Sequence, residues 1–273
     1  AIHNAHWQMV GFGDGFDTEP DPENHRCGYA MIQGGNLYYY NLDTGLTRRI
    51  KPTESAVKHR YNWNAALAID PIDKRTIYYG SQFVHKSSDK GKTWKIISPD
   101  LTTNDPEKQK QAESGGLTLD VTAAENHTTI VTIAPSPLTK DLIWVGTDDG
   151  QVQLTRNGGR NWQLVSSSIV TSKGKKKRKG KVPHGSNVPH IEASKFHEAS
   201  AFVVFEDHQR SNWAPYIYKT NDYGRNWQSI ATDEIDGFVH VIEQDHADPN
   251  LLFAGTEFGL FISFNGGKKW QKL

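Results

Sequence analysis

The chain has 273 residues, of which 36% are hydrophobic and 11% aromatic, enough apolar mass for a core and a composition that favours pleated sheets. Its 31 Lys and Arg residues balance 31 Asp and Glu residues, so it lacks the broad basic surface expected of a nucleic-acid-binding protein. No run approaches the roughly 18 apolar residues that a bilayer span requires, which predicts no transmembrane segment, and the single Cys27 excludes an internal disulfide.

The first predicted element is a degenerate repeat at residues 1–50. A turn at Asp21 and Pro22 precedes two β-rich runs at 28–31 and 36–40, and the repeat ends at 43–45 in Asp-Thr-Gly without a Trp. Because the chain starts at Ala1 with neither Met nor a signal segment, we expect a processed chain or a fragment.

Four later segments share the pattern Ser/Thr-x-Asp/Asn-x-Gly-x-x-Trp, the Asp box, and they start at Ser87, Thr155, Thr220 and Ser263. We expect the Ser or Thr to end a strand, the Asp or Asn to accept backbone N–H bonds across the turn, and the Gly to take a positive φ. The Trp then opens the next strand. The residues given this structural role are Asp89, Gly91, Trp94, Asn157, Gly159, Trp162, Asp222, Gly224, Trp227, Asn265, Gly267 and Trp270.

Each box closes a segment that turn residues divide into four short strands. We therefore predict an all-β fold, a β-propeller of four-stranded antiparallel blades with about five blades in this chain. A single domain spans 1–273, with blades at approximately 1–50, 62–98, 127–166, 188–231 and 237–273 and insertions at 99–126 and 167–187. Five blades could close alone or form part of a larger propeller, since propellers commonly have about four to eight.

A family resemblance follows from the boxes together with the stretches at 13–16 (Gly-Asp-Gly-Phe), 98–105 and 143–150. They resemble the large bacterial Asp-box proteins, called BNR or WD40/YVTN-like repeat proteins or VPS10/sortilin-like proteins, over essentially the whole chain. This resemblance implies an exported protein, extracellular, periplasmic or at the cell surface. The box is more distantly similar to those of xyloglucanase-type glycoside hydrolases and sialidases. Lys51 follows Arg49 and Ile50, so the Arg-Ile-Pro motif of sialidases is absent and sialidase activity is not expected.

The position of the boxes within each blade predicts where a ligand would bind. If the boxes join third and fourth strands on one face, the opposite face carries the inter-blade connections and the loops between second and third strands. We call it the long-loop face, and long loops on a rigid scaffold usually carry function. An exposed aromatic ring there would stack on a sugar while carboxylates and amides bond its hydroxyls. The predicted ligand-binding residues are Arg60, Tyr61, Asn62, Trp63, Asp148, Asp149, His208 and Glu257, although Trp63 could equally belong to the core.

Paired carboxylates on the same face would instead suit a glycoside hydrolase, and the catalytic candidates are Asp14, Asp120 and Glu125. No Cys/His cluster has the spacing of a zinc site, so neither a metal nor a cofactor is predicted. The basic run at 173–181 resembles a polyanion-binding patch, but its Gly content favours a solvated loop.

Three functions stay open. The preferred one is an exported recognition or scaffold propeller that binds a protein or polysaccharide ligand through the long-loop face. The second is a glycoside hydrolase-like enzyme. The third is a structural fragment of a larger propeller, completed by its remaining blades or by a partner chain. Recognition is preferred because the sequence contains no nucleophile-plus-base motif or phosphate loop, and a propeller scaffold alone implies no chemistry.

Overall fold

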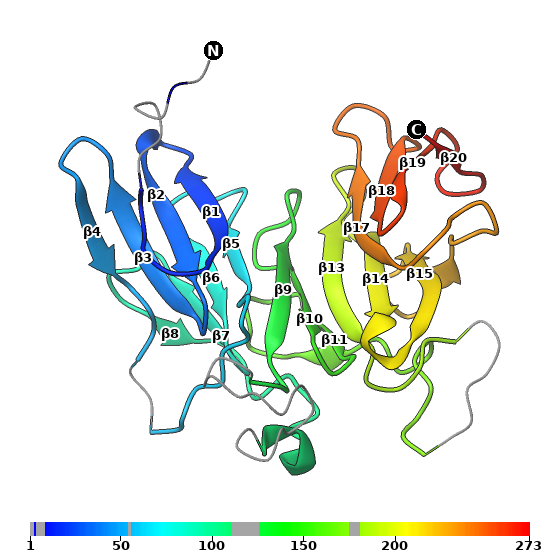
Figure 1. The fold of residues 1–273 in the computed structure, drawn as a ribbon, viewed down its shortest axis with the longest axis horizontal. Helices are drawn as coiled ribbons and strands as arrows, with labels where there is room; N and C mark the ends of the chain where they lie inside the picture. The colour runs from blue at the N-terminus through cyan, green and yellow to red at the C-terminus, as the bar shows by residue number, and fades with distance from the viewer. Residues whose placement is uncertain (1–2, 4–8, 54–55, 111–125, 175–180) are drawn as a thin grey trace.

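The computed structural model contains five four-stranded antiparallel sheets (Figure 1), and it describes residues 3, 9–53, 56–110, 126–174 and 181–273. Each sheet is a meander in chain order, which is the architecture of a propeller blade. The predicted all-β class with four-stranded blades is therefore confirmed.

The strands of the five blades are short, as the spacing of turn residues predicts. They are β1 (Gly15–Asp21), β2 (Asn24–Ile32), β3 (Asn36–Asn41) and β4 (Leu46–Arg49); β5 (Leu67–Ile69), β6 (Ile77–Gly80), β7 (Val84–Ser87) and β8 (Lys95–Ile96); β9 (Ile130–Pro135), β10 (Ile143–Thr147), β11 (Val152–Thr155) and β12 (Gln163–Leu164); β13 (Asn187–Ala193), β14 (Ala201–Asp207), β15 (Asn212–Thr220) and β16 (Gln228–Ser229); β17 (Val239–Gln244), β18 (Leu252–Thr256), β19 (Gly259–Ser263) and β20 (Gln271–Lys272).

Short 3-10 helices interrupt the loops at η2 (Pro106–Gln109) and η4 (His208–Arg210). Within the described ranges, no helix has the length and apolar character needed to cross a membrane.

The hydrophobic core is divided into clusters that lie between successive blades. Tyr79 lies in the cluster between blades 1 and 2, Tyr78 between blades 2 and 3, Trp144 between blades 3 and 4, and Trp270 between blades 4 and 5. None of these clusters, which cover the described residues, joins blade 5 to blade 1. The blades therefore form an open arc, consistent with part of a larger propeller (Figure 1).

The boxes form the turns between the third and fourth strands of blades 2 to 5. In the first box, Ser87 Oγ accepts the N–H of Gly91 at 2.8 Å, and Asp89 Oδ1 accepts the N–H groups of Lys92 and Thr93 at 3.0 and 2.9 Å. The bond from the Gly N–H to the leading hydroxyl recurs in the other three boxes at 2.9–3.0 Å. Each box is thus a self-contained turn.

Every box also contacts the blade that precedes it in the chain. The indole N–H of the box Trp donates to the carbonyl of the residue that ends the previous blade, and the box Gly packs against that same residue. We call this pair of contacts the box latch. The indole bonds are Trp94 to Ile50 at 2.7 Å, Trp162 to Ile97 at 2.9 Å, Trp227 to Val165 at 2.9 Å and Trp270 to Ile230 at 2.8 Å.

Candidate functional site

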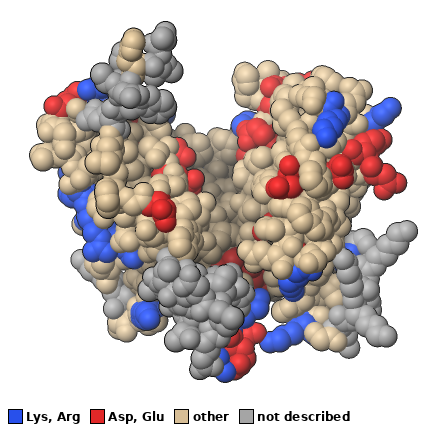
Figure 2. All heavy atoms as spheres, in the orientation of Figure 1, with Lys and Arg blue, Asp and Glu red and all other residues tan. Residues whose placement is uncertain are grey.

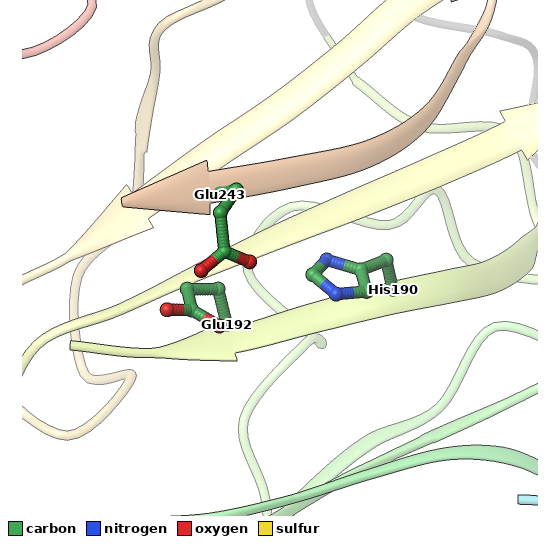
Figure 3. Close-up of side chains that lie close together, drawn as sticks. All are labelled: His190, Glu192 and Glu243. Carbon is green, nitrogen blue, oxygen red and sulfur yellow. The ribbon is translucent and has the colours of Figure 1, made fainter. Parts of the chain in front are cut away.

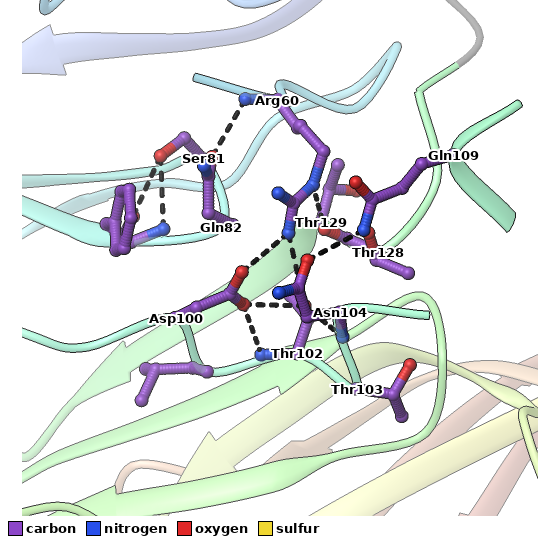
Figure 4. Close-up of polar contacts among 12 residues, drawn as sticks. Arg60, Ser81, Gln82, Asp100, Thr102, Thr103, Asn104, Gln109, Thr128 and Thr129 are labelled. Carbon is purple, nitrogen blue, oxygen red and sulfur yellow. Dashed lines mark hydrogen bonds and ion pairs between the residues drawn. The ribbon is translucent and has the colours of Figure 1, made fainter. Parts of the chain in front are cut away.

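The long-loop face is held together by polar contacts between successive connections (Figure 4). Arg60, between blades 1 and 2, forms an ion pair with Asp100, between blades 2 and 3, at 2.7 Å. Its Nε also donates to the carbonyl of Thr128 at 3.2 Å, and its backbone N–H donates to Gln82 Oε1 at 2.8 Å. The guanidinium is therefore already engaged, and Arg60 positions the loops around it.

The two aspartates of the loop between β10 and β11 are buried. Asp148 accepts the backbone N–H of Thr129 at 2.9 Å and its hydroxyl at 2.5 Å, while Asp149 accepts the N–H of Thr103 at 2.8 Å. Burial, followed by the charge of Asp149, raises the pKa of Asp148 above its usual value. Both carboxyl groups hold neighbouring loops in place, which makes them structural members of this face.

A pocket of about 250 Å³ opens among these loops, and we call it the amide pocket. It collects residues from the connections before blades 2 and 3, from β9 and β13, and from the loops after β10 and β14. Its lining residues are Asn62, Trp63, Asn126, His127, Val131, Asp148, Asn187 and Gln209. Three of the predicted ligand-binding residues, Asn62, Trp63 and Asp148, thus meet in one place.

Hydrogen bonds engage the amides of this pocket to different degrees. The Asn62 amide is engaged at both ends, since its Nδ2 donates to Thr129 Oγ1 at 3.0 Å and to Asp148 Oδ2 at 3.2 Å and its Oδ1 accepts the N–H of Asn64 at 3.1 Å. Asn126 Nδ2 donates to the carbonyl of Tyr61 at 2.9 Å, and Asn187 Nδ2 donates to Glu206 Oε1 at 2.9 Å. The buried Oδ1 of Asn187 has no hydrogen-bond partner among the described residues, which leaves one acceptor beside the pocket unpaired. Burial lowers the pKa of His127 to about 4, which leaves its imidazole neutral at neutral pH.

The other predicted site residues lie elsewhere. The prediction that Tyr61 binds a ligand is wrong. Tyr61 is 3% exposed in the core between blades 1 and 2, and its ring centroid lies 5.6 Å from that of Tyr79. Its ring is therefore not available to a ligand. His208 and Glu257 lie on the loops after β14 and β18, in blades 4 and 5. Asp14 is exposed near the start of β1, and Asp120 and Glu125 lie outside the described residues.

A second cavity, of about 570 Å³, occupies the centre of the arc and is lined by the first strands of blades 1 to 4. Asp17 and Glu19 of β1 line one wall, and His190, Glu192 and Lys195 line another. Figure 2 shows this hollow between the first and last blades, with carboxylates on both sides. None of these residues was predicted from the sequence. Their signal in the sequence is the spacing of two between Asp17 and Glu19 and between His190 and Glu192, which places each pair on one face of its strand.

A compact charged cluster lies beside this cavity, where β13 of blade 4 meets β17 of blade 5. One ligand atom each of His190, Glu192 and Glu243 lies within 4.8 Å of the others (Figure 3), a donor set that could hold a divalent ion. Lys195 Nζ lies 2.5 Å from a carboxylate oxygen of both glutamates, so the lysine already compensates their charge. Burial raises the pKa of Glu192 to about 7 because desolvation outweighs the attraction of Lys195.

Comparison with known proteins identifies the fold. No family model matches the chain, and no curated protein does. The GH74 xyloglucanase from Xanthomonas campestris aligns at 18% identity with a TM-score of 0.59, over 94% of this chain and 38% of that one. An ancestral GH74 enzyme aligns at 16% identity with a TM-score of 0.54, over 80% of this chain and 26% of that one. YCF48 from Cyanidioschyzon merolae gives 16% identity and a TM-score of 0.45, over 81% and 57% of the two chains.

The chain therefore spans less than two fifths of the length of either GH74 enzyme. At such identities the likeness shows the β-propeller fold alone, because this scaffold carries many unrelated functions.

Proposed function

We propose that this chain is part of a recognition propeller that binds a polysaccharide through the amide pocket. The observation that carries the proposal is the meeting of Trp63 with four side-chain amides, those of Asn62, Asn126, Asn187 and Gln209, in one pocket of about 250 Å³. An indole offers an apolar face to a sugar ring, and amides can both donate to and accept from hydroxyl groups. The volume lies just below the usual range for small-molecule sites, about 300–1,000 Å³, which suits one sugar unit.

The wider setting belongs to the same proposal. We place the chain among the exported bacterial Asp-box proteins of the BNR or VPS10/sortilin-like kind, which the four boxes support. The open arc supports completion by further blades or by a partner chain. Because a xyloglucanase is among the structures with this fold, xyloglucan is a sensible first polysaccharide to test.

The test of the amide pocket is a glycan array that includes xyloglucan, probed with the intact protein. We expect Trp63→Ala to weaken binding to the glycans recognised by about tenfold or more, since a buried aromatic anchor commonly contributes over 1 kcal/mol. The control is Phe264→Ala, because Phe264 is an exposed aromatic residue (64%) in the last box turn, away from the long-loop face. Unchanged glycan binding by Trp63→Ala would remove the pocket from consideration. A blank array with a specific protein captured in a pull-down would favour a protein ligand.

A glycoside hydrolase is the second candidate, and Glu192 is the observation that favours it. A carboxyl group with a pKa of about 7 beside an open cavity has the protonation state that a general acid needs at neutral pH. Lys195 argues against a hydrolase. Its Nζ bridges Glu192 and Glu243 and so occupies the space where a paired carboxylate would act.

Release of reducing ends from xyloglucan decides between these two functions. If Glu192 is the acid, Glu192→Gln should lower the rate by about 10² to 10⁴. The control is Asp43→Asn, because the Asp43 side chain is 57% exposed in the turn between β3 and β4 and lines neither the central cavity nor the amide pocket. No release by the wild-type protein would contradict the hydrolase.

A further inference from the structure

A cluster of aromatic rings joins the loops of blades 4 and 5. The His208 ring stacks on Phe238 with centroids 4.4 Å apart and planes at 14°, and His240 meets the edge of Phe238 at 4.7 Å. Trp213 lies edge-on to Phe238 at 5.3 Å and nearly parallel to Phe258, at 6.1 Å and 14°. We call these five residues the aromatic platform.

The outer rings of the platform are exposed, whereas the inner ring supports them. Trp213 is 50% exposed and Phe258 49% exposed, while Phe238 beneath them is 3% exposed. The backbone makes room for this arrangement at Gly237, where φ is +78° and a Cβ would lie 2.7 Å from the Phe258 ring. The two exposed rings are therefore held in place by packing and offer a preformed apolar surface.

The platform continues the amide pocket. His208 belongs to the platform and the next residue, Gln209, lines the pocket; both lie in η4. Their Cα atoms are therefore only about 3.8 Å apart. The loops after β14 and β18 are connections between second and third strands, so the platform lies on the long-loop face. We call pocket and platform together the strip, because η4 contributes one residue to each of them.

The chemistry of the strip favours a neutral sugar. His240 Nε2 lies 3.3 Å from Glu257 Oε2 at the platform edge, and both side chains are about half exposed, at 51% and 45%, so they can bond hydroxyl groups. The adjacent Arg210 is engaged by Asp207 and by the carbonyl of His184, which leaves it poorly placed to bind an anion. A stable protein interface uses about 20–30 residues a side, many more than this apolar patch provides.

We propose that the aromatic platform is a second sugar-binding subsite, which takes a neutral pyranose unit of the same polysaccharide whose neighbouring unit occupies the amide pocket. The sugar ring stacks on Trp213 and Phe258, and its hydroxyls reach Glu257 and His240. This inference rests on the proposed function, since it extends the same ligand along the same face.

Calorimetric titration of the intact protein with cello-oligosaccharides and xyloglucan oligosaccharides of increasing length tests the subsite. The affinity should rise with length until both subsites are filled. Trp213→Ala and Phe258→Ala should each weaken binding of the longer oligosaccharides by about tenfold, with little effect on the shortest that binds. Trp63→Ala should weaken binding at every length, and Phe264→Ala should match the wild type. Thermal unfolding of each variant verifies the fold, and Phe258→Ala serves if Trp213→Ala is unstable.

The outcomes separate the two proposals. Weaker binding only in Trp63→Ala overturns the platform and keeps the amide pocket. Weaker binding only in Trp213→Ala and Phe258→Ala supports the platform as a sugar site and overturns the pocket. If the wild-type protein binds none of these oligosaccharides, nor any neutral glycan on the array, both proposals are overturned.

Discussion

Replacing Gly159 by alanine is expected to lower the free energy of unfolding by about 2–5 kcal/mol, of which roughly 1–2 kcal/mol comes from the left-handed backbone and 1–3 kcal/mol from overpacking. The residue has a φ of +94°, and a Cβ would lie 2.2 Å from the carbonyl oxygen of Ile97, which accepts the indole bond of Trp162. The methyl group would push the third blade away from the second and break that bond. Urea denaturation followed by tryptophan fluorescence measures the loss.

Gly45→Ala is the matched control for this prediction. Gly45 also has a positive φ, +68°, but a Cβ there would meet nothing within 4 Å. Gly45→Ala should therefore lower the free energy of unfolding only by the backbone contribution of about 1–2 kcal/mol. If both substitutions destabilise the protein equally, the box latch contributes nothing beyond the conformation of its own turn.

The second large effect concerns pH. Glu192 has a pKa of about 7 in the folded protein against an ordinary value of 4.5, so the folded state binds its proton more tightly than the unfolded chain. Its contribution to stability is fully present below pH 4.5 and is lost as the pH rises through 7. The shift corresponds to about 3 kcal/mol. Glu192→Gln lacks this titration and should gain about that much stability relative to the wild type between pH 4.5 and 8.

Denaturation of both proteins across this pH range measures the difference directly. Gln228→Ala is the control, because Gln228 is exposed in β16, does not titrate and lies outside the central cavity. Its difference from the wild type should vary little with pH. A constant difference for Glu192→Gln as well would show that Lys195 keeps the carboxylate ionised at every pH tested.

The fold was predictable because its signal is local. Each box turn is closed by residues within eight positions, such as Ser87, Asp89 and Gly91, and therefore appears as a motif. The latch partner of each box was not predictable. Ile97 and Trp162 are 65 residues apart, and only the docking of two blades brings them together.

The candidate site was predicted in part for the same reason. Asn62 and Trp63 lie on a connection that the box phase places on the long-loop face, and they do line a pocket there. Tyr61 precedes them directly, but its ring enters the core, because the direction of a side chain within a loop is set by packing. In the sequence, Asp17 and Glu192 look like ordinary strand residues. Only the curvature of the arc places them around one cavity.

The box latch also gives the chain a direction of assembly. Every latch joins a box to the end of the blade that precedes it in the chain, from Trp94 on Ile50 to Trp270 on Ile230. During synthesis, the residue that each box Trp contacts has therefore already been made. Each blade can dock on the one before it as soon as its own box is complete. The propeller can therefore assemble blade by blade from its N-terminal side, and each added blade with a box forms one more indole bond to the blade before it.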